Sequence, residues 1–542
     1  MRRSIIYFIT SFVILAIVAL VLITFGADDD VQRYHQHLER PSEADLGLCL
    51  DCNNIELCTH LPVIIIDTFG AVIPGRPIAF IEGIYPADLR RTFQTGPNGE
   101  TEVEATVTII DNLNSWNHLS DDPIYESLAM MRIRGNSSRF FDKPNYRISL
   151  IDSNAEGNPL PLLGMAPHTE WALHGPFLDK TLMRNYMWMN IGAEVMGSGH
   201  FVPEVRFFEL VLNGDYQGVY VLMETIRPDP HRVNLNRYRD GMPATSYLAR
   251  IDTFTHTPDR MVNTLGSYTY RIERGSSWEI RYPGLSQQSE AVRDYVARSI
   301  SYTERHLFSP EIVWDSRAYQ DYIDVDSFVN FFIINEFIAN NDLWSGSTYI
   351  NKDIRNPRIS AGPLWDFNNV MDNLFLSMPV DEFMLANRGW FDRLMMCPDF
   401  TDRVIRRWHH LRERTLSEER LIDYMQDVEN WLGSAVDRNF EVWGYSFDPY
   451  QVSPMARRNS TYDERVARAY PYLYEGMSEE AYAAAIRQAR DELLREMNPA
   501  SFEIAMEQSR NFMIERGRFL DNYIEALRQY SHPSRHAHWI LE

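Results

Sequence analysis

The sequence predicts an α+β protein with a β-rich N-terminal part and a helical C-terminal part. Short β-branched and alternating runs follow one another between residues 61 and 152. Farther along, the pair Asn213-Gly214 separates two strand-like runs, which is a strong signal for a β-hairpin. Beyond residue 376 the apolar residues recur at the spacing of amphipathic helices. Strands that precede helices in this way are typical of an α+β fold.

The composition limits the classes of protein to which this chain can belong. Its 542 residues are enough for two or three domains. Hydrophobic residues make up 45% and aromatic residues 13% of the chain, so large cores can form and wholesale disorder is excluded. The formal net charge is −23, and there is no long basic run. Because binding along a nucleic acid needs clustered Lys and Arg, we expect no nucleic-acid partner.

Residues 1–26 predict a transmembrane signal anchor. Arg2 and Arg3 precede an uncharged run, 4–26, whose length at about 1.5 Å per residue covers a bilayer core. A cleaved signal peptide usually has a shorter apolar region. The positive-inside rule puts the N-terminus in the cytoplasm and the main body on the extracytoplasmic side, at a cell surface or in a lumen. We therefore expect a single-pass protein that meets the membrane through this helix.

Residues 27–60 predict a polar juxtamembrane stalk that ends in a cysteine cluster, Cys49, Cys52 and Cys58. A closed zinc site needs a fourth ligand, which Cys397 or His60 would have to supply. In an exported chain a disulfide within the cluster, or two disulfides if Cys397 takes part, is the commoner arrangement. The sequence leaves the pairing of the cysteines open.

The main body divides into three predicted parts. A β-rich N-terminal lobe covers 61–230, a mixed core that carries the candidate catalytic residues covers 231–376, and a helical region covers 377–542. In the first part, we expect Asp179 to cap a helix that stops at Gly197. In the second, the run VDSFVNFFIINEF is apolar on nearly all faces, which predicts a buried helix.

Two aspartates are the strongest candidates for catalysis. Asp342 follows the buried-helix pattern and Asp366 follows the short apolar stretch AGPLW, each in polar, turn-rich sequence. A carboxylate at such a boundary is held by the scaffold and open to a cleft, although an N-cap or turn aspartate has the same pattern. Together they predict one proton-accepting and one metal-holding carboxylate, the minimum for phosphoryl transfer. Asn368 and Ser347 are possible further metal ligands.

The phosphate-binding residues are predicted upstream of this pair. A donor-rich turn could offer N–H groups, hydroxyls and a guanidinium to phosphate oxygens; it consists of Arg134, Gly135, Asn136, Ser137 and Ser138. Lys143 could pair with phosphates as a point charge, and Glu224 could border a nucleotide pocket. The ordinary alternatives are that 134–138 is a plain turn, that Lys143 is an exposed lysine and that Glu224 lies at an exposed strand end. The chain has no G-x-S-x-G, H-E-x-x-H or Walker lysine motif.

Five motifs in a fixed order give the chain a family resemblance. They are RIRGNSS with K-P-x-Y-R-I, DKTLMRN, the hairpin L-x-L-N-G-x-Y-x-G-V-Y-x-L-x-E-x-I, N-x-D with STY, and AGPLWDFN. From about Leu61 to residue 530, the chain resembles the CotH family, the spore-coat protein H-like atypical protein kinases. The resemblance implies a diverged, two-lobed protein-kinase-like fold that binds ATP with Mg²⁺ or Mn²⁺ and phosphorylates Ser or Thr of exported proteins.

The resemblance also implies a role for each matching residue. Asp342 matches the catalytic aspartate and Asp366 the metal-binding aspartate, while Lys143 matches the nucleotide lysine and Glu224 a residue at the connection between the lobes. Some members carry Asn where this chain has Ser347, which leaves the number of metal ions open. The alternative function is a surface binding or adhesion protein on the same fold without catalysis. A third is another phosphoryl or nucleotidyl transferase.

Overall fold

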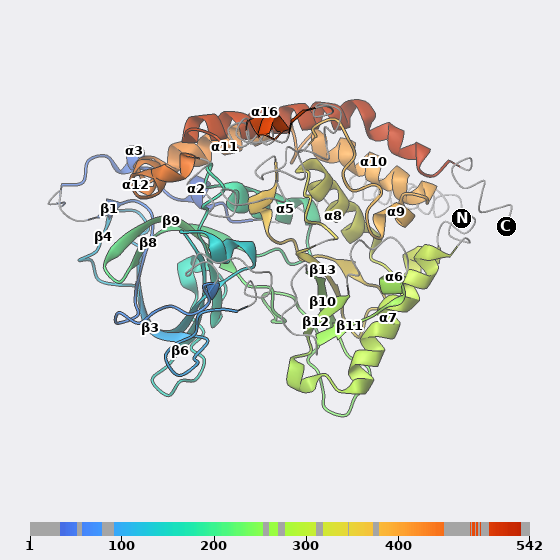
Figure 1. Ribbon diagram of the computed structural model, residues 1–542, viewed down its shortest axis with the longest axis horizontal. Coiled ribbons are helices and arrows are strands. Elements are labelled where there is room, and N and C mark those ends of the chain that lie inside the picture. Colours follow the sequence, from blue (N-terminus) through green and yellow to red (C-terminus); the bar gives the residue numbers. More distant parts are fainter. Residues whose placement is uncertain are drawn as a thin grey trace, which may run out of the picture.

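The computed structural model describes residues 33–50, 52, 57–78, 92–252, 260–268, 277–309, 318–344, 346–371, 379–448 and 498–532, with a few single positions between 477 and 488. Figure 1 shows a β-barrel beside a second sheet, both beneath a layer of helices. The β-rich N-terminal part and the helical C-terminal part are therefore confirmed. The anchor predicted at 1–26 lies outside the described residues, and within them no helix has the length and apolar character needed to cross a membrane.

Seven strands of the N-terminal part close into a barrel in the order β2-β3-β5-β6-β7-β9-β8. All neighbours are antiparallel except β2 and β8, which are parallel with Ile64 opposite Leu210. Alternate side chains point inward, so that Ile64, Met131 and Ile148 are fully buried. The bounds are β2 Val63–Asp67, β3 Val103–Ile110, β5 Tyr125–Arg134, β6 Asn145–Ile151, β7 Glu170–His174, β8 Val205–Leu212 and β9 Asp215–Glu224.

The barrel corrects the prediction of a kinase-like N-terminal lobe. The predicted hairpin is confirmed, because Asn213 and Gly214 both have positive φ, 53° and 85°, as a type I′ turn between strands requires. What the sequence did not predict is that these strands close into a barrel. The pairing of β8 with β2 leaves neither strand as an open edge. Strands so far apart in the sequence leave no local signal of this pairing.

A second, five-stranded sheet has the order β11-β12-β10-β13-β14 and is antiparallel throughout. Helix α7, Glu290–Phe308, packs against its outer strand β11, with the short helix α6, Leu265–Tyr268, beside it (Figure 1). The strand bounds are β10 Tyr247–Ile251, β11 Met261–Val262, β12 Trp278–Tyr282, β13 Thr348–Lys352 and β14 Ser360–Ala361.

Two buried helices form the middle of the protein. Helix α8 spans Val325–Phe337, as predicted, and its N-cap Asp324 accepts a hydrogen bond from Ser327 N at 3.3 Å. Helix α5 spans Arg184–Met196 and ends at Gly197 as predicted, but it begins later than expected. Asp179 therefore lies before the helix, although its Oδ2 accepts from the first helical N–H, that of Arg184, at 2.8 Å.

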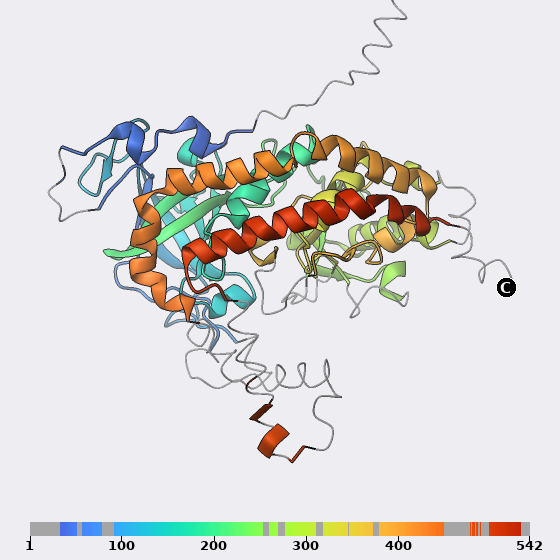
Figure 2. The same cartoon turned by 90° about the horizontal axis from the view of Figure 1, so that it is seen from above.

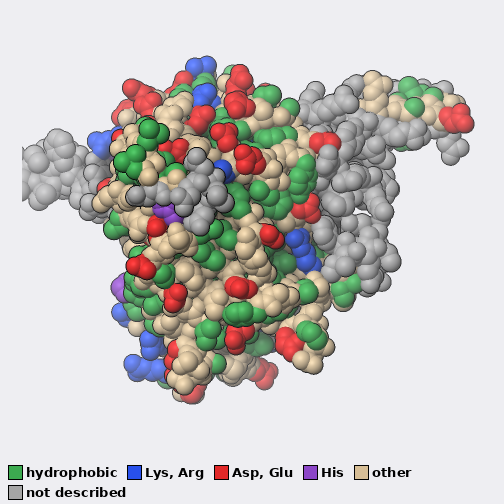
Figure 3. All heavy atoms as spheres, turned by 90° about the vertical axis from the view of Figure 1, so that its left-hand side faces the viewer, with side chains coloured by type: hydrophobic (Ala, Val, Ile, Leu, Met, Phe, Trp, Pro, Cys, Tyr) green, Lys and Arg blue, Asp and Glu red, His purple; other side chains and the backbone are tan. Residues whose placement is uncertain are grey.

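The remaining helices cover α5 and α8. Figure 2 shows α16 running across the molecule beside α11 and α10, and α16 packs against both α8 and α11. Acidic side chains are scattered over the face seen in Figure 3, so the net charge of −23 defines no single acidic patch there. The bounds are α9 Phe391–Leu394, α10 Pro398–Arg412, α11 Glu418–Leu432, α12 Ser434–Trp443 and α16 Phe502–Tyr523.

The N-terminal segment 33–50 is attached to this body. It contains the one-turn helices α2, Gln36–Glu39, and α3, Glu43–Leu46. The buried amide of Gln36 accepts from Phe207 N at 2.7 Å and donates to Phe207 O at 3.1 Å, so it pairs with strand β8 like a backbone group. This part of the predicted stalk is therefore packed against the barrel.

A buried ion pair joins the central and C-terminal helices. The carboxylate of Glu336 on α8 accepts from Arg516 on α16 and from the N–H groups of Met384 and Leu385, both at 2.7 Å. Arg516 also donates to the carbonyl of Glu336 at 3.0 Å and to that of Val380 at 3.0 Å. Neither side chain is more than 2% exposed. Both charges are thus fully hydrogen-bonded, which buried charges require.

We predict that Arg516→Met destabilises the protein by about 3–5 kcal/mol, because the Glu336 carboxylate is left buried without its cation. The control is Arg518→Met on the same helix, since Arg518 is 64% exposed and pairs with Glu418 at the surface. That change should cost less than about 1 kcal/mol. Thermal and urea unfolding of both variants would measure the difference. Equal losses would contradict a special contribution of the buried pair.

Candidate active site

Asp342 lies in the turn that follows α8. Asn340 fixes this turn, since its N–H donates to Asn335 O at 2.9 Å and its Nδ2 donates to Asn335 Oδ1 at 2.8 Å. Asn340 Oδ1 accepts from Asp342 N at 3.2 Å, and Asp342 O accepts from Gly346 N at 2.7 Å. The end of the buried helix thus determines the backbone position of the predicted catalytic residue.

Arg388 holds the same turn from another part of the chain. Its two terminal nitrogens donate to the backbone oxygen and to the side-chain oxygen of Asn341, each at 2.8 Å. Burial raises the pKa of Asp342, and the positive charge of Arg388 opposes part of this rise. Sequence reasoning missed this residue, because an arginine in a polar stretch is ordinary and its partner lies far away in the sequence.

Asp366 is held in a left-handed backbone conformation, φ 69° and ψ 64°, just before the 3₁₀ turn Phe367–Asn369. The N–H of Phe367 donates to Asn185 Oδ1 on α5 at 2.9 Å, and Asn185 Nδ2 lies 3.0 Å from His174 Nε2 on β7. Positive φ outside glycine costs about 1 kcal/mol and persists where surrounding contacts enforce it. Here helix α5 and the barrel strand β7 supply those contacts.

Two bonds join the Asp366 segment to the Asp342 turn. Met371 N donates to Ile338 O, at the end of α8, at 3.0 Å. The side chain of Asn369 donates a hydrogen bond to the Asp342 carboxylate, and Asn368 Nδ2 donates to Asn369 Oδ1 at 2.9 Å. The structure therefore brings the two predicted aspartates together. It also gives Asn369, which sequence reasoning did not single out, a direct contact with Asp342.

Asp252 is a third carboxylate of this cluster that sequence reasoning missed. It directly follows β10, and the pairing of Ile251 with Thr348 places it across from Ser347, the residue before β13. Its Oδ1 accepts from Asn136 Nδ2 at 3.0 Å. The signal was present, because Asp252 ends the strand-like run SYLARID as a carboxylate leaving a buried element.

The three negative charges act on one another. The pKa of Asp366 is raised to about 6, first by burial and then by the charge of Asp342, while the Ser347 hydroxyl and Arg134 oppose the rise. Burial, followed by the charge of Asp252, raises the pKa of Asp342. Ser347 Oγ donates to Asp366 Oδ2 at 3.1 Å. Asp342 and Asp366 are thus held with more negative charge than their protein neighbours neutralise, whereas Asp252 Oδ2 lies 2.8 Å from a terminal nitrogen of Arg250.

This donor set fits a divalent cation that prefers oxygen ligands, such as Mg²⁺ or Mn²⁺. Asp366 and Asp252 are the residues that would hold it. The described residues contain one group of three potential ligands within 4.8 Å of one another, and that group consists of cysteines. The aspartates are therefore not a closed cage. Mg²⁺ commonly binds through one or two carboxylates and keeps its other positions for water and substrate phosphates.

The predicted phosphate-binding turn lies next to the aspartates. Arg134 at the end of β5 stacks 5.0 Å from the ring of Trp365, and its charge opposes the rise in the pKa of Asp366 that burial causes. Gly135 has φ 107°, and a Cβ there would lie 1.9 Å from Ser138 Oγ, so the turn requires glycine. Asn136 contacts Asp252, whereas Ser137 is exposed. Arg134 and Asn136 are thus the members of the turn that reach the cluster.

Further arginines lie on the barrel strands, or shortly after one, near Arg134. Arg132 on β5 pairs across the strands with Arg147 on β6. Arg147 and Arg227 each lie 2.8 Å from Glu170 Oε2. The carboxylate of Glu170 balances part of this charge and consequently has its pKa lowered to about 2. Sequence reasoning missed these three arginines as a group because they are scattered over several segments of the chain.

Lys143 and Glu224 lie in other surroundings. Lys143 is 1% exposed, and its Nζ donates to Val219 O at 2.7 Å and to Asn439 Oδ1 at 2.6 Å, which joins β9 to α12. Glu224 accepts from Glu204 N at 2.9 Å and lies 3.7 Å from Arg232. These contacts are structural. The structure does not bring either residue to the aspartate cluster.

The family model described as CotH kinase protein matches residues 131–520. The match begins within β5, ends within α16 and includes all three aspartates of the cluster. No curated protein matches the sequence.

We predict that Asp366→Asn stabilises the metal-free protein at about pH 7.5 by roughly 3 kcal/mol. The pKa of Asp366 rises from 3.8 to about 6 on folding, so the folded state disfavours the charged carboxylate above that pH. Below the unfolded value both states are protonated, and the advantage of Asn should almost vanish near pH 3.5. Urea unfolding at the two pH values measures the difference in stability between variant and wild type. The control is Asp326→Asn, which changes a carboxylate that is 80% exposed. A destabilised Asp366→Asn at neutral pH would contradict the prediction.

Proposed function

Because the chain belongs to the CotH kinase protein family, we propose that it transfers the γ-phosphoryl group of ATP to a Ser or Thr hydroxyl of a protein. The observation that carries the proposal is the cluster of Asp252, Asp342 and Asp366 beside Arg134, with raised pKa values at Asp342 and Asp366. Asp252 is ion-paired with Arg250, whereas Asp342 and Asp366 are only partly compensated by neighbouring groups. Carboxylates of this kind facing Arg134 suit a cation and a phosphate group together.

Asp342 is the proton acceptor in this proposal. The acceptor hydroxyl gives its proton to a carboxylate oxygen of Asp342 as its oxygen bonds to the γ-phosphorus, and the bond to the ADP oxygen breaks. A pKa raised by burial makes Asp342 a stronger base than an exposed aspartate, provided it is ionised at working pH. Arg388 and Asn369 keep its turn and carboxylate in place.

Asp366 and Asp252 hold the metal ion in this proposal. When bound, Mg²⁺ or Mn²⁺ neutralises charge on the phosphates and on the carboxylates. The Ser347 hydroxyl orients Asp366 through its 3.1 Å bond. Where the family resemblance led us to expect a possible Asn ligand, the chain has this serine with Asp252 across from it. We propose that the Asp252 carboxylate supplies the metal ligand that an Asn at the position of Ser347 would have supplied.

Arg134 is the phosphate-binding cation in this proposal, in place of Lys143. Its planar guanidinium can bind two phosphate oxygens at once, and its stacking on Trp365 limits its orientations. The uncharged run that follows Arg2 and Arg3 supports an extracytoplasmic site of action and an exported protein as acceptor.

The test is phosphate transfer by the purified protein from ATP to itself and to generic Ser-containing acceptors, with Mn²⁺ or Mg²⁺. Asp342→Asn should lower the rate roughly 10²- to 10⁴-fold, since a general base is lost. Asp366→Asn and Asp252→Asn should be at least as inactive at moderate metal concentration, while Asp326→Asn should retain activity. A wild type as inert as Asp366→Asn with every acceptor and metal would overturn the proposal. Mass spectrometry of the acceptor distinguishes added phosphate from added AMP.

A second test compares the two cations predicted for the nucleotide. With ATP and Mn²⁺ present, the wild type should show a higher melting temperature than without them. Arg134→Met should weaken nucleotide binding roughly 10- to 100-fold and remove most of this shift. Lys143→Met should keep the shift, because Lys143 Nζ already binds Val219 O and Asn439 Oδ1. If Lys143→Met removed the shift and Arg134→Met kept it, Lys143 and not Arg134 would be the nucleotide-binding cation.

A further inference from the structure

Three cysteines at the N-terminal edge of the barrel form a compact group of potential metal ligands. The Sγ atoms of Cys49, Cys52 and Cys58 lie within 4.8 Å of one another, and all three side chains are partly exposed. No disulfide joins any of the four cysteines, all of which are among the described residues. The expected disulfide is therefore absent, and three thiols converge at a distance from the aspartate cluster.

His118 is the candidate for the fourth ligand, although its ring nitrogens lie outside the group of three thiols whose sulfur atoms are within 4.8 Å of one another. Its Nε2 lies 3.3 Å from Cys49 Sγ. The small sheet of β1, Cys58–Thr59, and β4, Asn117–His118, pairs Cys58 directly with His118, which puts their side chains on the same face. In a tetrahedral zinc site with usual bond lengths, sulfur and nitrogen ligands lie about 3.5 Å apart. The distance from Cys49 Sγ to His118 Nε2 is close to this value.

The second nitrogen of His118 faces a carboxylate. Nδ1 lies 3.4 Å from Asp121 Oδ2, and the same oxygen accepts from His118 N at 2.8 Å and from Asn112 Nδ2 at 2.7 Å. Asp121 is thus fixed before any ion binds. A carboxylate on the far nitrogen is the usual means of orienting a metal-binding histidine, because it selects the tautomer with Nε2 available.

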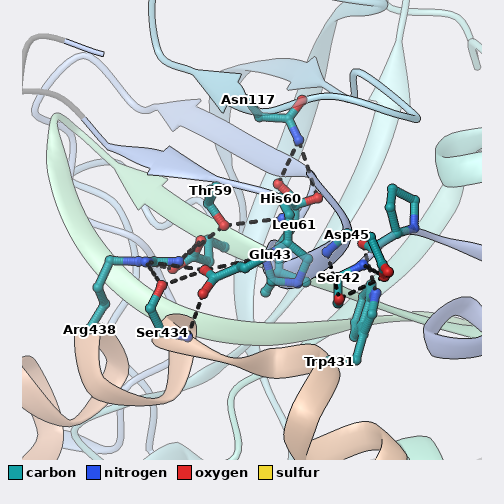
Figure 4. A network of polar contacts seen from close by, with 12 residues as sticks. Ser42, Glu43, Asp45, Thr59, His60, Leu61, Asn117, Trp431, Ser434 and Arg438 are labelled. Carbon is teal, nitrogen blue, oxygen red and sulfur yellow. Dashed lines mark hydrogen bonds and ion pairs between the residues drawn. The ribbon is translucent and has the colours of Figure 1, made fainter. Parts of the chain in front are cut away.

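The two alternative fourth ligands from the sequence lie elsewhere. His60 stacks edge-on against Trp431, with ring centroids 5.2 Å apart, and its Nδ1 is 3.4 Å from Glu43 (Figure 4). Cys397 is fully buried before α10, where its Sγ donates to Arg393 O at 3.9 Å. The ligand that completes the set comes from the connection between β3 and β5.

We propose that Cys49, Cys52, Cys58 and His118 bind one zinc ion in a closed, structural site. Two thiols in a C-x₂-C spacing, a third from a strand and a histidine from the paired strand are a tetrahedral Cys₃His set. Binding replaces the three thiol protons, which pass to solvent, and leaves no open position for substrate. The ion's function is therefore to hold chain segments together.

The segments that the ion joins are already in contact. Arg40 donates to the two carboxylate oxygens of Asp111 at 2.6 and 2.8 Å, at the start of the same β3–β5 connection. Figure 4 shows Glu43 meeting Ser434 of α12 and Asn117 Nδ2 donating to Leu61 O at 2.9 Å. The zinc ion adds a metal–ligand link between the N-terminal segment and the barrel, independent of the proposed kinase activity.

The test uses the full-length protein, purified without chelator and dialysed into metal-free buffer. Elemental analysis should find about one zinc per chain. Cys58→Ser and His118→Ala should each weaken zinc binding roughly tenfold or more, and Asp121→Asn about 10- to 100-fold, whereas Cys397→Ser should not change it. The assignment would be overturned if Cys58→Ser and His118→Ala each retained as much zinc as the wild type.

Two measurements on the wild type keep the test valid if a variant fails to fold. Cobalt chloride added to the zinc-depleted protein should give thiolate-to-cobalt absorption, which the aspartate cluster cannot produce. Alkylation after denaturation without reductant should modify all four cysteines once EDTA is present. Two missing thiols would demonstrate a disulfide and overturn the proposal, as would the absence of both bound zinc and the cobalt signal.

Discussion

The buried pair of Glu336 and Arg516 holds together the parts of the chain on which the aspartate cluster depends. Glu336 sits at the end of α8, one residue after Asn335, which fixes the turn of Asp342. The same carboxylate accepts two N–H groups of the segment that leads to Arg388, which holds that turn from the other side. A buried charge with this many bonds allows only one arrangement of its neighbours, because every alternative leaves an ion without a partner.

The cluster itself works against stability. Burial and neighbouring carboxylates raise the pKa of Asp342 and of Asp366, and Asp366 also adopts a left-handed backbone conformation. Folding keeps them close through bonds that do not involve their charges, such as Met371 N to Ile338 O and the β10–β13 ladder. A metal ion with a phosphate would relieve this repulsion, so in our proposal the destabilised apo state is what makes ligand binding favourable.

In our two proposals, two kinds of cation chemistry are separated on this fold. The oxygen set beside Arg134 is open and suits a hard ion that shares its shell with phosphate. The sulfur-rich set around Cys49 and His118 is closed and suits zinc. In each set sequence reasoning missed one residue: Asp252, which directly follows a strand paired with β13, or His118, which lies in a strand paired with that of Cys58. Metal sites are assembled by strand register, which a single sequence does not reveal.

The sequence by itself determined the elements with local causes. The apolar run 325–337 became α8, Asn213-Gly214 became the hairpin turn, and Asp342 and Asp366 were identified because each leaves a buried element. Only the tertiary structure decided the barrel closure between β2 and β8, the placement of Lys143 against Asn439 and the addition of Asp252 to the cluster. The physical reason is range: helix periodicity and turn dihedrals act over a few residues, whereas strand pairing and buried charge depend on contacts between segments far apart in the chain.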